Sequence, residues 1–151
     1  MDESGVLVGV AALVVREGRC LLVRRGKAPN AGRWALPGGR LRHGESLAAG
    51  ALRELREETG VEADALGVVD ISEVRGASHH YVLITQACRW RRGEGVAADD
   101  ASALGWFARG ELEALGEALV PAVRSLVERR LAAAVEEGAG AVAKSVVETS
   151  S

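Results

Sequence analysis

The stretch GRLRHGESLAAGALRELREETGV, residues 39–61, decides how the rest of this chain is interpreted. Ser46 is a residue type preferred at helix N-caps, and no proline interrupts residues 47–59. Gly60 follows at the position where helices commonly end in the left-handed conformation that glycine adopts without strain. The stretch therefore predicts a glycine-containing loop followed by a helix over residues 47–59.

Carboxylates gather on one face of this predicted helix. At about 100° per residue, Glu54, Glu57 and Glu58 fall on one arc together with Gly50. Arg53 lies one turn before Glu57, so these two side chains can pair. A neighbouring arc is apolar and should face the core; it holds Ala48, Ala51, Leu52 and Leu55.

Two explanations fit such a cluster of carboxylates. The first is a solvated acidic face, on which Glu54 and Glu58 repel each other weakly across one turn. The second is a divalent cation, and side chains that offer only oxygen favour Mg²⁺ or Mn²⁺ over Zn²⁺. Gly50, which has no side chain, should then leave room on this face for the ion or for a phosphate.

The spacing of these residues resembles the signature of the Nudix hydrolase family, G-x5-E-x7-R-E-U-x-E-E-x-G-U, in which U is aliphatic. Every fixed position is present, at Gly39, Glu45, Arg53, Glu54, Leu55, Glu57, Glu58, Gly60 and Val61. The run WALPGG, residues 34–39, also resembles the segment that commonly precedes this Nudix box. The resemblance favours a catalytic helix over a merely solvated one.

Length and composition favour a single domain. With 151 residues, of which 48% are apolar, we expect one domain over residues 1–137 and a mobile tail over residues 138–151. No apolar run approaches the roughly 20 residues of a membrane span, and residues 6–15 lack the features of a signal peptide. The net charge of −2 gives no indication of a nucleic-acid-binding surface. Cys20 and Cys88 lie in apolar runs, and we expect reduced core thiols in a cytoplasmic protein.

The order of the other predicted elements indicates an α/β fold. We expect strands at residues 6–15, 19–24, 67–75, 80–90 and 103–107, with a short strand at Trp34 and Leu36. Residues 37–39, Pro-Gly-Gly, predict a tight turn, and helices are expected over residues 109–115 and 120–135. This order fits an α/β/α sandwich with a mixed β-sheet between helices, which is also the fold that the resemblance implies.

The resemblance implies hydrolysis of the diphosphate bridge of a nucleoside diphosphate linked to another moiety, with Mg²⁺ (or Mn²⁺) as cofactor. Glu54, Glu57 and Glu58 are the expected metal ligands, and the family pattern adds the carbonyl of Gly38. Glu54 or Glu58 can instead take the proton of the attacking water, and Arg53 should hold Glu57 in place. Glu45 either stabilises the helix N-terminus or contacts the metal. A further acid from a loop is common in the family, and the candidates here are Glu94, Asp99 and Asp100.

The substrate is less sharply indicated than the reaction. The runs HYVLI, DDAS and WF, at residues 80–84, 99–102 and 106–107, resemble Nudix members that act on ADP-ribose and related sugar nucleotides. Residues that can bind such a substrate are Arg24, Arg25 and Arg33 for phosphates, Trp34 or Tyr81 for a base, and Gly39 through close backbone approach.

The alternatives to ADP-ribose are a nucleoside triphosphate, a diadenosine polyphosphate or capped RNA. A different class is a Nudix protein that senses a nucleotide without cleaving it, but such proteins lose box acids, and here all are present. The expected partner is a small nucleotide substrate, with no membrane or nucleic acid, and a homodimer is possible.

Overall fold

A mixed β-sheet forms the centre of the computed structural model, which describes residues 5–27 and 30–133. The strand order is β3-β2-β1-β6-β5, with β4 also paired to β1 and β7 to β2. β1 and β6 run parallel, whereas the other paired strands are antiparallel. The strands are β1 (Leu7–Arg16), β2 (Arg19–Arg25), β3 (Trp34–Ala35), β4 (Gly38–Arg40), β5 (Glu62–Arg75), β6 (His80–Arg92) and β7 (Ala101–Phe107).

Strand β1 is apolar on both faces because helices cover the sheet on both sides. Alternate side chains of a strand point to opposite faces, and two separate cores result. The first core contains Ala11, Leu13, Cys20, Leu22, Leu36, Leu112, Leu119, Leu126, Val127 and Leu131. The second core contains Val10, Ala12, Val14, Leu21, Ala51, Leu55, Val61 and Cys88.

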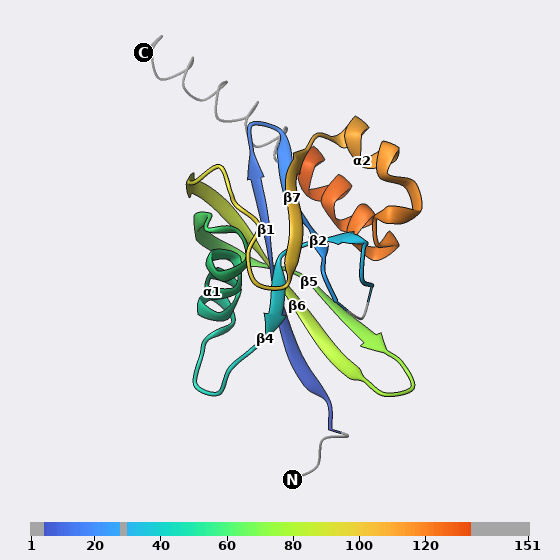
Figure 1. The fold of residues 1–151 in the computed structure, drawn as a ribbon. Coiled ribbons are helices and arrows are strands. Elements are labelled where there is room, and N and C mark those ends of the chain that lie inside the picture. The colour runs from blue at the N-terminus through green and yellow to red at the C-terminus, as the bar shows by residue number, and fades with distance from the viewer. Residues whose placement is uncertain (1–4, 28–29, 134–151) are drawn as a thin grey trace.

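The helices form the two outer layers of an α/β/α sandwich (Figure 1). Helix α1 (Leu47–Thr59) packs on the second core. Helix α2 (Arg109–Leu115), the 3-10 turn η1 (Gly116–Ala118) and a further helix over residues 121–133 cover the first core. The predicted sandwich with its mixed sheet is therefore confirmed.

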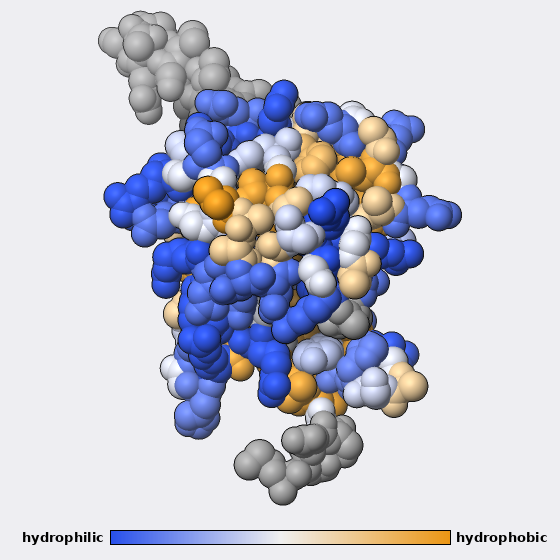
Figure 2. Space-filling view, in the orientation of Figure 1, coloured by the Kyte–Doolittle hydropathy of each residue, from blue (hydrophilic) through white to orange (hydrophobic). Residues whose placement is uncertain are grey.

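Helix α1 begins and ends where the sequence predicts. The Ser46 hydroxyl accepts a hydrogen bond from the Ala49 N–H at 3.0 Å, and Gly60, with φ of 72°, donates its N–H to the Arg56 carbonyl. Ala51 and Leu55 are fully buried. The outward face of the α1 region is hydrophilic (Figure 2), as expected for an amphipathic helix at a surface.

The predicted tight turn at residues 37–39 is wrong. Gly38 and Gly39 belong to strand β4, in which they pair with Ala11 and Val10 of β1. A Cβ added to Gly38 would collide with the Val10 carbonyl oxygen. Glycine is therefore needed here for close contact between two strands, and not for a turn.

The predicted boundaries of the last long hairpin are also wrong. Strand β5 begins at Glu62, five residues before the predicted Gly67, and β6 continues to Arg92. Glu62 pairs with Arg92 in the ladder, so the two extensions support each other. Gly67 has φ of 138° and lies at an irregularity of this ladder, which explains why the sequence suggests a strand boundary there.

Most other predictions of local structure are confirmed. The strands expected at residues 6–15 and 19–24 form β1 and β2, and residues 109–115 form α2. Cys20 and Cys88 are free and buried, and burial raises the pKa of both thiols, that of Cys88 to about 11. In the described part of the chain, no helix is long and apolar enough to cross a membrane. The predicted tail at residues 138–151 and the end of the helix expected over residues 120–135 lie outside the described residues.

Replacing Leu55 by Ala should lower the free energy of unfolding by about 2–5 kcal/mol, because it leaves a cavity in a fully buried site. Urea unfolding followed by circular dichroism measures this. Leu66→Ala is the matched control, since Leu66 is 46% exposed and its truncation should cost much less. Equal losses in both variants would contradict the packing described for α1.

Candidate active site

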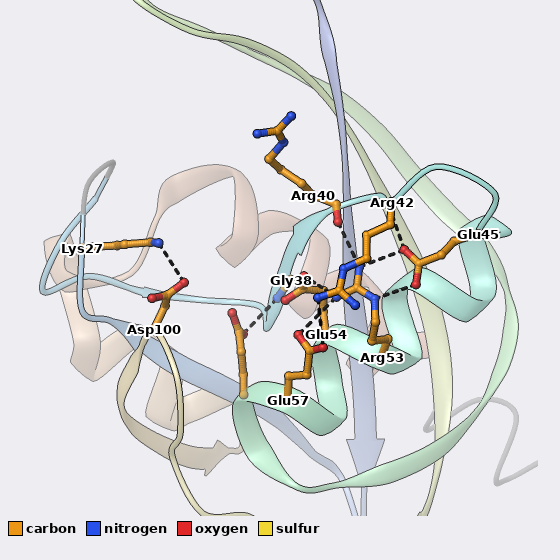
Figure 3. Close-up of polar contacts among 10 residues, drawn as sticks. Lys27, Gly38, Arg40, Arg42, Glu45, Arg53, Glu54, Glu57 and Asp100 are labelled. Atoms are coloured by element: carbon orange, nitrogen blue, oxygen red, sulfur yellow. Dashed lines mark hydrogen bonds and ion pairs between the residues drawn. The ribbon is translucent and has the colours of Figure 1, made fainter.

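Arg53 is the centre of a polar network between α1, β4 and the loop that joins them (Figure 3). Its Nε donates to Glu45 Oε2 at 2.6 Å, and its Nη1 donates to Glu54 Oε1 at 2.8 Å and to Glu57 Oε2 at 3.2 Å. Its Nη2 donates to Glu45 Oε1 at 2.9 Å and to the Arg40 carbonyl at 3.0 Å. The predicted pair of Arg53 and Glu57 is confirmed, but it is one part of a larger network.

Arg53 holds three of the box glutamates in this network, and Arg42 Nη2 adds a contact to Glu57 Oε1 at 3.4 Å. The Arg53 side chain is only 13% exposed, so its charge is poorly screened by water. Hydrogen bonds from Arg53 and from the Arg42 N–H lower the pKa of Glu45 to about 2, and the same carboxylates raise the pKa of Arg53. Glu45 therefore orients Arg53 and also accepts a hydrogen bond from the Arg42 N–H in the box loop. This structural role differs from the predicted stabilisation of the helix N-terminus, and the metal contact of Glu45 stays a prediction.

Glu58 lies on the same helix but outside this network. It is 7% exposed, and its Oε2 accepts a hydrogen bond from the Gly38 N–H at 3.1 Å. Burial is the main cause that raises the pKa of Glu58, to about 7. The Gly38 N–H and Arg25 lower the pKa, and the negative charges of Glu54 and Asp100 raise it. Shifted carboxyl groups of this kind are common where a protein binds a cation or transfers a proton.

The two glycines predicted to make room have different roles. A Cβ at Gly39 would lie 2.5 Å from Glu54 Oε1, so the absence of a side chain there creates the space that the Glu54 carboxylate fills. A Cβ at Gly50 would lie 2.7 Å from Leu41 Cδ1 and 3.3 Å from Val10 Cγ2. The prediction that Gly50 leaves room for an ion or a phosphate is wrong, because Leu41, Val10 and the Glu45 carboxylate occupy that space.

The residues present fit a divalent cation in their chemistry. Glu54 and Glu57 each place an oxygen on the same nitrogen of Arg53, which holds the two carboxylates close together. The absence of a side chain at Gly39 lets the Glu54 carboxylate lie against strand β4, and Glu58 adds a buried carboxyl group that accepts a hydrogen bond from the Gly38 N–H. Within residues 5–27 and 30–133, however, no three side chains of His, Cys, Asp or Glu converge in a metal-holding geometry.

The other candidate residues from the sequence lie in different places. Arg25 acts electrostatically on Glu58, whereas the Arg24 Nε donates to Ser102 Oγ at 3.0 Å. Trp34 packs edge-on against Phe107 at 5.1 Å beside the first core, and Arg33 is exposed. The structure therefore brings Arg25 near the carboxylates, and the substrate roles of these residues stay predictions.

The three candidate loop acids have different surroundings. Glu94 pairs with Arg16, whose guanidinium lies 3.9 Å from the Trp90 ring centroid. Asp99 is exposed, with φ of 51°. Asp100 alone among the three influences the pKa of Glu58, and its Oδ2 lies 3.0 Å from Lys27 Nζ. The sequence pattern does not mark Lys27, because its partner is far away along the chain.

Comparison with known proteins shows to which family this chain belongs. The sequence model of the NUDIX domain family matches residues 5–129 of this chain. The chain belongs to the Nudix family. A solved structure with this fold is the MutT NUDIX hydrolase of Burkholderia pseudomallei, with 32% identity and a TM-score of 0.72, covering 82% of this chain and 97% of that one.

Relatives of this Nudix chain have different names. The MutT-like protein of Streptomyces ambofaciens is 39% identical over 70% of this chain and 66% of its own length. The ADP-ribose pyrophosphatase of Methanocaldococcus jannaschii is 30% identical over 66% of this chain and 60% of its own length. The putative 8-oxo-dGTP diphosphatase 2 of Mycobacterium tuberculosis is 45% identical over 40% of this chain and 44% of its own length. The chain thus spans two thirds or less of the length of these relatives.

Because the pKa of Glu58 is raised, the free energy of unfolding of the metal-free protein should decrease as the pH increases. The pKa of Glu58 in the folded protein, about 7, exceeds the ordinary value of 4.5 for a glutamate, so the folded state binds more protons than the unfolded state between these pH values. The free energy of unfolding should therefore decrease by up to about 3 kcal/mol from pH 4.5 to pH 7. Urea unfolding in EDTA across this range measures the effect.

Glu58→Gln should lose this decrease, because Gln keeps an acceptor for the Gly38 N–H and does not ionise. Glu113→Gln, which changes an exposed glutamate of α2, should keep the pH profile of the wild type. Identical profiles for the wild type and Glu58→Gln would show that Glu58 is not a buried, protonated group.

Proposed function

We propose that this Nudix chain hydrolyses the diphosphate bridge of a nucleoside diphosphate linked to another moiety, and that ADP-ribose or a related sugar nucleotide is its substrate. The observation that carries the proposal is the Arg53 network, which holds Glu54 and Glu57 on one nitrogen, with Glu54 against Gly39, while Glu58 accepts a hydrogen bond from the Gly38 N–H. The relative named ADP-ribose pyrophosphatase supports the choice of substrate.

The proposed cofactor is Mg²⁺, with Mn²⁺ as the alternative. Glu54, Glu57 and Glu58, together with the Gly38 carbonyl, would hold it. When bound, such an ion neutralises charge on a diphosphate and lowers the pKa of a coordinated water. Oxygen ligands alone are the set that these hard cations prefer.

The side chains have separate tasks in this proposal. Arg53 holds Glu54 and Glu57 in fixed positions, which removes the cost of ordering them when substrate binds. Glu58 can accept the proton of the attacking water, because a carboxyl whose pKa is about 7 changes its protonation state near neutral pH. Glu54 is the alternative proton acceptor, since its carboxylate lies directly against Gly39.

A nucleoside triphosphate pyrophosphohydrolase is the second candidate. The relative named putative 8-oxo-dGTP diphosphatase 2, which is 45% identical over 40% of this chain, favours this second candidate. Both candidates need the same cleavage chemistry, so the products distinguish them: AMP and ribose 5-phosphate from ADP-ribose, or a nucleoside monophosphate and pyrophosphate from a triphosphate. Diadenosine polyphosphates and capped RNA complete the panel of substrates.

The remaining proposals concern partners and location. A small nucleotide is the proposed partner, and neither a membrane nor nucleic acid is required by the chemistry. The two buried free thiols fit a reducing compartment, which supports a cytoplasmic location. A homodimer stays a prediction that sedimentation equilibrium can test.

Glu57→Gln and Glu58→Gln should each lower turnover by orders of magnitude, because each removes a charge from the carboxylate set while preserving shape. Phosphate-containing products from the substrate panel, separated by ion-exchange chromatography, measure the rates. Glu113→Gln serves as the control and should keep the wild-type rate. Near-normal rates in both box variants would reject the assignment, and binding without turnover by the wild type would favour a nucleotide sensor.

Removing divalent ions should abolish activity and change stability. Excess EDTA should stop hydrolysis, and Mg²⁺ added back should restore it. At pH 8, Mg²⁺ should also raise the melting temperature of the wild type more than that of Glu58→Gln, because an ion bound only by the folded state stabilises it. Full activity in EDTA, or the same thermal shift in both proteins, would contradict the metal site.

A further inference from the structure

The best-placed cation in the carboxylate cluster has no capacity left for a substrate. Each of the three guanidinium nitrogens of Arg53 already donates to a protein oxygen at 2.6–3.2 Å. An arginine has five N–H donors in a fixed planar arrangement, and turning this one toward a phosphate would leave buried carboxylates unpaired. A side chain that binds a phosphate of the substrate, in addition to the proposed metal ion, must therefore be a cation other than Arg53.

Arg24 is not that cation either. It lies on β2, where its Nε donates to Ser102 Oγ of β7. Side chains alternate along β2: Leu22 points into the first core and Leu21 into the second. By this alternation Arg24 is expected on the face of α2 rather than on the face of α1, which carries the carboxylates.

Lys27 meets the requirement for an accessible cation. Its Nζ lies 3.0 Å from Asp100 Oδ2, and the two side chains are 66% and 56% exposed. The pair lies on the other side of Gly38 from the Arg53 guanidinium (Figure 3). Lys27 is therefore open to solvent and bound to an acid that is itself close enough to affect Glu58.

Backbone contacts fix this pair relative to α1. The Gly26 N–H donates to the Asp100 carbonyl at 2.8 Å, which joins the end of β2 to the loop before β7. The Ala98 N–H donates to the Glu58 carbonyl at 2.9 Å, which joins the same loop to the end of α1. Main-chain hydrogen bonds thus fix the backbone at Gly26 and Asp100, next to Lys27, close to the end of α1, independently of the Lys27–Asp100 ion pair.

We propose that Lys27 binds a phosphate of the substrate, and that it does so by exchanging the Asp100 carboxylate for the phosphate. This inference rests on the proposed function for the nature of the ligand. The exchange costs little, because an exposed ion pair contributes about 0–1 kcal/mol, and a lysine binds phosphate well as a compact charge.

The exchange also removes the Lys27 ammonium group from the Asp100 carboxylate. Without substrate, Asp100 is neutralised by Lys27. Once phosphate has taken Lys27, Asp100 is a carboxylate without this cation beside Glu58, at the moment when the diphosphate is in place. Lys27 is therefore a substrate-binding residue, and Asp100 becomes available to the site only when substrate binds.

Equilibrium binding of α,β-methylene-ADP, a nucleoside diphosphate whose bridge resists hydrolysis, tests this in the presence of Mg²⁺. Lys27→Met should raise the Kd measured by calorimetry by about ten- to a hundredfold, as expected for loss of a hydrogen bond to a charged group. Lys27→Arg should recover most of the affinity. Asp100→Asn should keep or increase the affinity, because it removes the competitor for Lys27.

Arg91→Met is the matched control. Arg91 and Asp64 form another exposed pair at 3.4 Å, with side chains 64% and 51% exposed, and its loss should leave the Kd unchanged. An unchanged Kd in Lys27→Met, an equal loss in Arg91→Met, or an equal loss in Asp100→Asn would each overturn the inference. So would a wild type that binds neither this probe nor inorganic pyrophosphate.

The substrate panel separates failure of this inference from failure of the proposed function. Turnover by the wild type together with a Kd independent of Lys27 would reject the role of Lys27 and leave the hydrolase intact. Binding that depends on Lys27, without turnover of any substrate, would reject the hydrolase and leave the phosphate contact intact.

Discussion

The interaction on which this site depends is the contact of one arginine with several acids. Arg53 pairs with Glu45, Glu54 and Glu57, and the exposed Arg42 reaches only Glu57, so the three acids still outnumber their cations in a partly buried place. Removing one member of such a buried set leaves the others uncompensated, which is much more costly than loss of an exposed pair. The network thus fixes the geometry of the carboxylates and leaves them short of cations, a condition that a bound divalent ion relieves.

The rest of the fold serves to hold α1 and β4 in contact. The alternation of side chains along β1 anchors α1 on one face of the sheet, and the missing side chains of Gly38 and Gly39 allow β4 to approach both β1 and Glu54. A Cβ at either glycine would meet an oxygen atom at once. Gly38, just before the box, allows β4 to pack against β1. Gly39, the first residue of the box, allows the Glu54 carboxylate to lie against β4.

The sequence predicts the parts of this structure that depend on local interactions. The ends of α1 follow from Ser46 and Gly60, whose capping roles need only neighbouring residues. Gly38 and Gly39 suggested a turn because glycine favours turns, but pairing with β1 overrides that preference. The start of β5 at Glu62 depends on Arg92, and the position of Lys27 depends on Asp100. Contacts between distant residues are not visible in one sequence, so these features required the structure.

The two buried cysteines lie on opposite sides of the sheet, Cys20 in the first core and Cys88 in the second. The sheet between them keeps the thiols from meeting, and their raised pKa values make both poor nucleophiles in the folded state. Each of the two cores consequently contains one thiol whose modification can be measured separately. The rate at which a thiol reagent modifies Cys20 follows exposure beneath α2, and the rate at Cys88 follows exposure beneath α1. Loosening of the layer that contains α1 can thus be distinguished from loosening of the layer that contains α2 without introducing a label.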